Sequence, residues 1–247
     1  MGNSNMTNSG QGNKFNINIG QVTGGDVQVG DRTYHGTQST TPSSSPQSAP
    51  TGVKPSIPKR TILLLAASPT DQARLRLDVE VREINQGLRL GQQRDQFNLQ
   101  QRWAIRPDDL RRALLDFQPQ ILHFCGHGEG TAGLVLEGQA GTSKLISTEA
   151  LASLFQQFAN RGLECIILNA CYSDVQATAI AQHIPYVIGM NSAIGDTAAV
   201  KFSVGFYDAL GAGWSYPDAY KLGCNAIALE GIAQDAIPVL KALLENT

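Results

Sequence analysis

A histidine and a cysteine stand at points of the chain where reactive side chains are expected. His127 lies between two glycines directly after the apolar segment 120–124, and Cys171 follows the apolar segment 165–168. The flanking glycines let the backbone turn sharply and let a substrate approach closely. An imidazole beside a thiol favours the thiolate, which is the nucleophilic form of cysteine. The pair therefore predicts nucleophilic catalysis by Cys171, provided that the fold brings the two side chains together.

The elements around this pair must position it, and from residue 60 onward their pattern is that of an α/β domain. Apolar segments typical of buried strands alternate with segments of helical periodicity. This alternation predicts a mostly parallel sheet with helices on both faces. The expected strands are 61–67, 97–105, 120–124, 133–137, 165–168 and 186–189, and the expected helices are 71–90, 107–117, 147–160, 175–183, 196–210 and 218–229, with the type of 237–244 left open.

The two candidate residues each follow a strand of this predicted sheet. The carboxyl ends of parallel strands lie at one edge, which is where ligand and catalytic groups are found in such folds. If the two strands are neighbours, their ends place His127 and Cys171 close together. On spacing alone, the alternative stays open that a glycine-rich turn and an unrelated strand-end cysteine produce the pattern.

The other cysteines and the nearest histidine have a structural interpretation. Cys165 falls inside an expected strand and Cys224 inside an expected helix, so both are predicted to be small buried apolar groups. Cys125 is interpreted as structural, and His123 is expected to be packed within its strand. No two cysteines show the two-residue gap of a zinc knuckle, so no metal is expected. The chain begins without a basic segment followed by an apolar one, which predicts a cytoplasmic protein with reduced cysteines.

Composition separates the chain into unlike parts. The 247 residues include only 16% charged residues and have a formal net charge of −2, which excludes an obvious electrostatic nucleic-acid binder. No apolar run reaches about 18 residues, so no transmembrane helix is expected. Residues 1–58 are dominated by Asn, Gly, Ser, Thr, Gln and Pro, and such a composition predicts disorder. We divide the chain into an Asn/Gly-rich segment 1–35, a Pro-rich flexible linker 36–59 and a folded domain 60–247.

The first segment carries a pattern of its own. Residues 15–20 alternate apolar and polar side chains, and residues 27–30 do so again after a pair of glycines. Two such arms are too short to be stable alone, but stacked copies can form side-chain ladders and dry zippers. The alternative is a Gly/Asn-rich tail in which the alternation is incidental. A resemblance to RHIM-like amyloid signalling motifs favours assembly, and it rests on Val27, Gln28, Val29 and Gly30.

Four separated motifs of the folded domain resemble the CHAT domain of the caspase-like cysteine peptidases. They are LHFCGHGEG at 122–130, GLVLEG at 133–138, IILNACYSD at 166–174 and PYVIGMNSAIGDTAAVKFSVGFYDAL at 185–210. The segment TILLLAASPTDQARLRLDVEVREI at 61–84 also looks like the start of bacterial members. The likeness covers most of residues 60–239.

This resemblance implies a caspase-like three-layer α/β sandwich and peptide-bond hydrolysis by a His–Cys dyad. By their places in the motifs, His127 is implied to be the general base and Cys171 the nucleophile. The backbone N–H groups of Gly128 and Cys171 are candidates for the oxyanion hole. A histidine about 50 residues upstream of the cysteine is also the caspase arrangement.

Two departures from the family pattern leave substrate specificity open. Relatives with strict basic specificity carry an aspartate two residues before the nucleophile, where this chain has Asn169. Asp174 stands where the group often has glycine. We retain Asn169, Asp174 and Asp196 as candidates for the substrate pocket, although either aspartate can instead cap a helix.

The sequence thus predicts a cysteine endopeptidase that needs no cofactor and cleaves protein substrates. Assembly with itself or with an upstream sensor is expected to activate it in a bacterial signalling or cell-death pathway, and neither nucleic acid nor a membrane is expected as a partner. The alternative is a catalytically inactive caspase-like adaptor that acts through N-terminal assembly. A nucleotide-binding domain is disfavoured because no Gly-rich phosphate loop of the expected pattern is present.

Overall fold

A six-stranded sheet forms the centre of the larger of two units, 1–54 and 55–247, which are described separately. The computed structural model describes residues 27–29, 32–34 and 59–243. The strands of the sheet are β3 (Arg60–Ala66), β4 (Phe97–Trp103), β5 (Ile121–Cys125), β9 (Cys165–Asn169), β10 (Tyr186–Met190) and β11 (Pro238–Ala242). Their order is β11-β10-β9-β5-β3-β4, and all neighbours run parallel except β10 and β11. The segment whose type the sequence left open is therefore the antiparallel edge strand.

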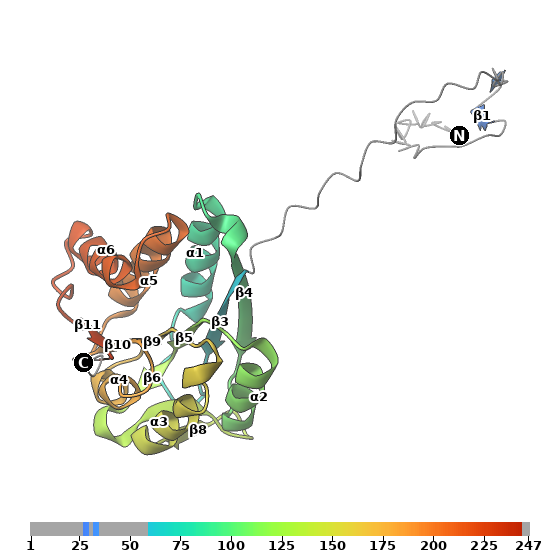
Figure 1. The fold of residues 1–247 in the computed structure, drawn as a ribbon. Coiled ribbons are helices and arrows are strands. Elements are labelled where there is room, and N and C mark those ends of the chain that lie inside the picture. The colour runs from blue at the N-terminus through green and yellow to red at the C-terminus, as the bar shows by residue number, and fades with distance from the viewer. Residues whose placement is uncertain (1–26, 30–31, 35–58, 244–247) are drawn as a thin grey trace, which may run out of the picture. The chain divides into compact units, whose positions relative to one another are not determined.

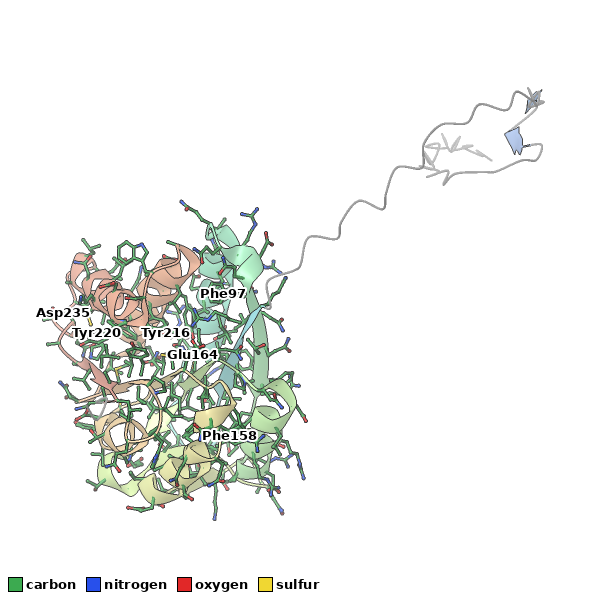
Figure 2. All side chains as sticks on the ribbon, in the orientation of Figure 1. Phe97, Phe158, Glu164, Tyr216, Tyr220 and Asp235 are labelled. Atoms are coloured by element: carbon green, nitrogen blue, oxygen red, sulfur yellow. The ribbon has the colours of Figure 1, made fainter. Side chains whose placement is uncertain are left out.

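Helices cover both faces of this sheet and complete three layers (Figure 1). One layer consists of α1 (Leu77–Leu90), α5 (Asp196–Gly211) and α6 (Tyr216–Leu229), and the other of α2 (Pro107–Phe117), α3 (Thr148–Gln156) and α4 (Asp174–Ile180). Figure 2 shows Tyr216 and Tyr220 on the side of α5 and α6, and Phe158 on the opposite side. A cluster of buried apolar side chains fills the space on each face. The predicted α/β sandwich is confirmed.

The central strands are continuous apolar sequences because helices cover both faces of the sheet. In β5 and β9 every residue is buried. Helix α1 shows a different pattern, with one buried stripe at Leu77, Glu80, Val81, Ile84 and Leu88. Among the described helices, none combines the length and the apolar character that a membrane crossing requires.

A second, three-stranded antiparallel sheet follows β5 along the chain. It consists of β6 (His127–Gly128), β7 (Leu134–Glu137) and β8 (Ser143–Ile146), with β7 in the middle. The sequence predicted only β7. Its neighbours lack a strand signal, because β6 has two residues and β8 has no buried residue. Three single turns of 3-10 helix complete the elements: η1 (Arg94–Gln96), η2 (Gly130–Ala132) and η3 (Ala159–Arg161).

The first helix starts later than the sequence predicted. A helix was expected over 71–90, but α1 begins at Leu77 and the preceding residues form a loop. The Asp71 Oδ1 atom accepts hydrogen bonds from the backbone N–H and from the hydroxyl of Ser143, each 2.8 Å long. The N–H of Thr70 also donates to the Gly141 carbonyl at 2.9 Å. These contacts attach the loop to the β7–β8 hairpin, and tertiary contacts of this kind outweigh weak local helix propensity.

A polar cluster joins the sheet to α6. The Tyr216 hydroxyl donates to Glu164 Oε2 at 2.8 Å, and the Arg60 guanidinium donates to the same hydroxyl at 2.6 Å and also pairs with Glu164. Glu164 and Tyr216 lie close together in Figure 2. Arg60 opens β3, and Glu164 directly precedes β9, so three elements that are distant in sequence meet here.

The smaller unit contains a hairpin. Strand β1 (Val27–Val29) pairs in antiparallel register with β2 (Arg32–Tyr34). Gly30 and Asp31 stand between the two strands in the sequence, and both lie outside the described residues, so the structure describes Val27, Gln28 and Val29 of the predicted assembly motif but not Gly30. The partner of Val27–Val29 thus follows it in the sequence, whereas the predicted other arm at 15–20 lies outside the described residues.

Candidate active site

Strands β5 and β9 lie side by side and end at the same edge of the sheet. In their parallel register Cys125 is opposite Asn169, and the Gly126 N–H donates to the Asn169 carbonyl at 3.3 Å. His127 follows the end of β5 by two residues and Cys171 follows the end of β9 by two. The two strands are therefore adjacent, as the prediction of a His–Cys pair required. His127 and Cys171 both lie just beyond the same edge of the sheet.

Both side chains line one narrow pocket of about 40 Å³. Its walls come from the loop before α1 and from α1 itself, from the ends of β5 and β9, and from the start of α5. The lining residues are Leu75, Arg76, Leu77, Glu80, Gly126, His127, Asn169, Ala170, Cys171, Ile194, Asp196, Ala199 and Val200.

The imidazole of His127 is held by the loop that precedes α1. Its Nε2 atom lies 2.7 Å from the backbone carbonyl oxygen of Ala73. A carbonyl oxygen only accepts hydrogen bonds, so Nε2 carries the proton and Nδ1 is left as the basic nitrogen. Ala73 was missed by sequence reasoning, because the contact uses a main-chain atom of an unremarkable residue within a predicted helix.

The turn that carries Cys171 is conformationally unusual. Tyr172 has φ +54° and is one of three non-glycine residues with positive φ among the described residues. Its N–H donates to the Ser192 carbonyl at 3.1 Å, and the Ser173 hydroxyl bridges the Leu168 carbonyl and the Met190 N–H. A left-handed conformation at a bulky residue is strained and persists only where surrounding contacts impose it. The Cys171 side chain is half-buried, with its sulfur 3.8 Å from the Ile194 carbonyl.

Gly128 lies directly against the backbone of the nucleophile candidate. A Cβ atom at this position would stand 2.2 Å from the carbonyl oxygen of Cys171. The next residue, Glu129, donates its N–H to Gly133 across the β6–β7 ladder. Hydrogen-bonded positions alternate in an antiparallel ladder, so the Gly128 N–H points away from β7. Glycine is therefore required here, and its N–H is available to a ligand.

The three substrate-pocket candidates from the sequence have different surroundings. Asn169 and Asp196 line the pocket, whereas Asp174 does not and instead pairs with Lys241 on β11 at 2.8 Å. Neither aspartate is an N-cap, since these positions are Ser173 for α4 and Gly195 for α5. Each aspartate occupies the first turn of its helix, where a negative charge is favourable.

A buried polar network lies beneath the pocket, and sequence reasoning missed its centre. Glu80 Oε1 accepts hydrogen bonds from Asn169 Nδ2 at 2.5 Å, Ser203 Oγ at 2.7 Å and His123 Nε2 at 3.1 Å. The Nδ1 atom of His123 lies 3.1 Å from the Tyr207 hydroxyl. The available signal was a glutamate on the apolar stripe of α1, one turn after Leu77 and one turn before Ile84.

Within the described residues, Glu80, His123 and Cys125 bring ligand-type atoms within 4.8 Å of one another. Both ring nitrogens of His123 and one oxygen of Glu80 already have hydrogen-bond partners. We therefore interpret this cluster as a structural hydrogen-bond network and not as a metal centre.

The environments of the other thiols differ from that of Cys171. Cys125 and Cys165 are fully buried, and burial raises the pKa of both thiols well above the ordinary value. Cys224 is half-buried in α6, and burial again raises its pKa. We therefore expect these three thiols to react slowly near neutral pH, because the thiolate is the nucleophile.

The sequence and the fold are similar to those of known proteins. A sequence profile described as CHAT domain matches residues 31–220. A Roc-COR-CHAT protease from an unknown prokaryotic organism is 27% identical over 61% of this chain and 15% of its own length. A probable protease of Gillisia limnaea (strain DSM 15749 / LMG 21470 / R-8282) is 22% identical over 70% of this chain and 30% of its own length. The chain thus spans less than a third of either relative.

Among solved structures, a secreted C11 cysteine protease from Bacteroides thetaiotaomicron, in complex with an irreversible peptide inhibitor, has the same fold. It superposes with a TM-score of 0.55 at 13% identity and covers 76% of this chain and 67% of its own. The fold is therefore that of the caspase-like cysteine proteases. Because the profile match extends over most of the sequence, the chain belongs to the CHAT domain family.

Proposed function

We propose that this chain is a cysteine endopeptidase with Cys171 as the nucleophile and His127 as the general base. The observation that carries the proposal is that both side chains line one pocket, at the carboxyl ends of adjacent parallel strands. The word protease in the names of both relatives supports it. Protein substrates follow from this activity.

The hydrogen bond to Ala73 supports different roles for the two ring nitrogens of His127 in this proposal. With the Nε2 proton directed at the carbonyl, Nδ1 accepts the proton of the Cys171 thiol. The thiolate attacks the scissile carbonyl carbon, a C–S bond forms, and the carbonyl π electrons move to oxygen. Collapse of this intermediate breaks the C–N bond, and the imidazolium gives its proton to the leaving amine.

The backbone N–H groups of Gly128 and Cys171 stabilise the oxyanion in this proposal. The Gly128 N–H faces away from its ladder partner, and the Cys171 N–H has no backbone acceptor among the described residues. Two such donors, fixed before the reaction, stabilise the charge that develops on the carbonyl oxygen. Water then hydrolyses the thioester, with His127 again acting as the base, and regenerates the thiol.

Comparing Cys171→Ala with Cys224→Ala tests this function. The second variant removes a half-buried thiol in α6, outside the pocket. We expect the full-length chain and Cys224→Ala to cleave members of a protein and peptide library, and Cys171→Ala to cleave none while keeping its melting temperature. Cleavage by Cys171→Ala would remove the mechanism. A wild-type chain that cleaves nothing would instead support the inactive adaptor.

We further propose that assembly through the N-terminal motif activates the peptidase in a bacterial signalling or defence pathway. The support is the β-prone hairpin of β1 and β2 together with the alternating sequence of residues 27–30. A two-stranded hairpin has two unpaired edges, which can template pairing with further copies. Linking many peptidase domains in one assembly raises their local concentration.

Fibril formation tests the assembly step separately from catalysis. A peptide of residues 14–35, which includes both β1 and β2, is expected to form thioflavin-positive fibrils with cross-β spacings, and the full-length chain is expected to sediment with them. Placing aspartate at Val27 and Val29 introduces repelling charges into the stacked strand and should prevent both. A peptide that remains monomeric at high concentration would contradict the assembly proposal and leave the catalytic proposal intact.

A further inference from the structure

We propose that Gln176 is a positioning residue of the active site, and that its side-chain amide fixes the geometry of the oxyanion hole. This inference rests on the proposed peptidase function and adds to it a residue that lies outside the pocket. It comes from a buried hydrogen bond that joins the segment after His127 to the helix after Cys171.

The two proposed oxyanion donors belong to different segments of the chain. The Gly128 N–H is in β6, which follows strand β5, and the Cys171 N–H is in the turn that follows strand β9. At the strand ends the two segments still share a backbone hydrogen bond. Beyond that point, the described structure has one hydrogen bond between residues 127–132 and residues 170–180, and it is the one donated by Gln176.

The amide of Gln176 binds two neighbouring segments at once. Its Nε2 atom donates to the Gly130 carbonyl oxygen and to the Thr148 hydroxyl oxygen, each at 2.7 Å, and the Gln176 side chain is fully buried. Gly130 in turn lies against the residue that follows the nucleophile, because a Cβ atom at Gly130 would stand 3.6 Å from the Cβ atom of Tyr172. The amide therefore holds the segment that carries Gly128 beside the cysteine turn.

The second polar atom of this amide indicates that packing alone does not explain the glutamine. The Oε1 atom of Gln176 is buried and has no hydrogen-bond partner among the described residues. A buried acceptor without a partner is costly, and a leucine of similar size would fill the space without one. The opposite orientation of the amide would place Oε1 against the Gly130 carbonyl oxygen, and two acceptors repel each other. The hydrogen bond to Gly130 thus sets the orientation of the amide, even though this leaves Oε1 without a donor.

The distance between the two N–H donors follows from these contacts. Gly128 lies so close to the Cys171 carbonyl oxygen that no Cβ atom fits between them, which limits their approach. The hydrogen bond from Gln176 to Gly130, two residues further on, opposes their separation. An oxyanion hole acts through donors that are fixed before the charge develops, so a small displacement of one donor slows the chemical step more than it weakens substrate binding.

Replacing the amide by an apolar side chain of similar size tests the proposal. With the best peptide substrate of the full-length chain, we expect Gln176→Leu to lower kcat about 10- to 30-fold and to change KM less than about threefold. A peptide aldehyde of the same sequence reports on the oxyanion hole directly. The Cys171 thiolate adds to the aldehyde carbon, a C–S bond forms, and the carbonyl oxygen becomes an oxyanion, so the affinity should weaken by about the same factor as kcat.

Alkylation by iodoacetamide separates this effect from general damage to the site. The reaction displaces iodide from a saturated carbon and forms no oxyanion. The rate at which Cys171 is alkylated in Gln176→Leu should therefore stay within about threefold of the wild-type rate.

Gln176→Glu keeps the shape of the side chain and makes its donor depend on pH. A protonated carboxyl group donates to the Gly130 carbonyl and accepts from the Thr148 hydroxyl, whereas a carboxylate has no proton to donate to Gly130. Burial favours the protonated form, so we expect the ratio of kcat in this variant to kcat in wild type to rise at least about threefold from about pH 8 to about pH 5.5. Charged residues of α4 and of the segments packed near it are present in both proteins and cancel in this ratio: Asp174, Glu129, Glu149 and Lys241.

Gln120→Leu is the matched control. Gln120 is a half-buried glutamine whose amide also binds main-chain groups, since it accepts from the Thr61 N–H at 2.7 Å and donates to the Gln118 carbonyl at 3.2 Å. It precedes β5, at the end of that strand away from the site. We expect this variant to lose stability and to keep the kcat and the aldehyde affinity of the wild type.

The outcomes separate this inference from the proposed function. Equal losses of kcat and of iodoacetamide reactivity in Gln176→Leu would overturn the positioning role, and so would a wild-type kcat in that variant. If Gln176→Leu does not fold, the Gln176→Glu ratio decides, and a ratio that does not change with pH would overturn the proposal. Absence of any Cys171-dependent cleavage by the wild type would remove the peptidase function and this inference with it.

Discussion

The imidazole of His127 donates a hydrogen bond of 2.7 Å to the backbone carbonyl of Ala73, in the loop that precedes α1. The two residues are far apart in sequence, and the loop is attached to the β7–β8 hairpin by the side chain of Asp71. In the proposed mechanism this chain of contacts fixes which ring nitrogen is basic. In that mechanism the loop positions the general base even though it supplies no reactive side chain.

Removing the attachment of this loop should lower the rate of the chemical step. Asp71→Ala deletes the acceptor of both hydrogen bonds from Ser143, and Asp71→Asn retains an oxygen in the same place. We expect kcat to fall about tenfold or more in the alanine variant with a smaller change in KM, because small displacements of catalytic groups are costly. The asparagine variant should recover most of the rate. Equal losses in both variants would show that the loop acts through charge and not through position.

The four thiols should react with iodoacetamide at very different rates. Burial raises the pKa of Cys125, Cys165 and Cys224, whereas Cys171 is half-buried and lines the same pocket as His127. Near pH 7.5 we expect Cys171 to be alkylated at least about tenfold faster than the other three. Mass spectrometry of tryptic peptides after timed quenching measures this. Uniform slow labelling would favour the inactive adaptor.

A methyl group at Gly128 should damage the site. The added Cβ would lie 2.2 Å from the Cys171 carbonyl oxygen, so the two segments must separate. We expect Gly128→Ala to lower kcat about 10²- to 10³-fold, since it displaces an oxyanion donor. Its stability should fall by about 1–3 kcal/mol from overpacking. Gly138→Ala is the control, because its nearest atom would be 3.3 Å away and it lies outside the pocket. A fully active Gly128→Ala enzyme would contradict the assigned oxyanion hole.

Glu80 should make folding sensitive to acid. Its folded-state pKa lies below the ordinary value of 4.5, so the unfolded chain takes up a proton first as the pH falls. The stabilisation linked to this group is complete above pH 4.5 and is lost as the pH drops through and below that value. Urea unfolding of wild type and Glu80→Gln between pH 3 and 7 checks this. The difference in their free energies of unfolding should shrink toward the acid end, and a difference that grows there would contradict the assignment.

The cluster around Tyr216 should contribute to stability and not to catalysis. Tyr216→Phe removes the hydroxyl that accepts from Arg60 and donates to Glu164. Loss of these hydrogen bonds in a half-buried setting should lower the free energy of unfolding by about 1–2 kcal/mol. Tyr186→Phe is a matched control, since its ring lies 5.3 Å from that of Tyr216 and its hydroxyl has no hydrogen bond among the described residues. Unfolding in urea and peptide cleavage together distinguish the two roles.

The strands and most helices could be predicted from sequence, because burial on one or two faces leaves a periodic signature. The segments around Leu122 and Ile166 are continuous apolar runs and became β5 and β9. The helix predicted over 107–117 is α2 (Pro107–Phe117), and a proline in the first turn is a common feature of helix starts. The predicted start of α1 at residue 71 was wrong. The segment 71–76 fits a helical pattern, but contacts of this loop with Ser143 and Gly141 hold it outside the helix.

For the candidate site, the sequence by itself determined that a histidine and a cysteine follow separate strands. Only the tertiary structure decided that these strands are neighbours and that both side chains line one pocket. It also decided two contacts between residues that are distant in sequence: the Ala73 carbonyl accepts a hydrogen bond from the His127 imidazole, and the Glu80 carboxylate accepts one from Asn169. A main-chain acceptor leaves no mark on residue type, and a glutamate within an apolar stripe does not reveal which distant residues will donate hydrogen bonds to it.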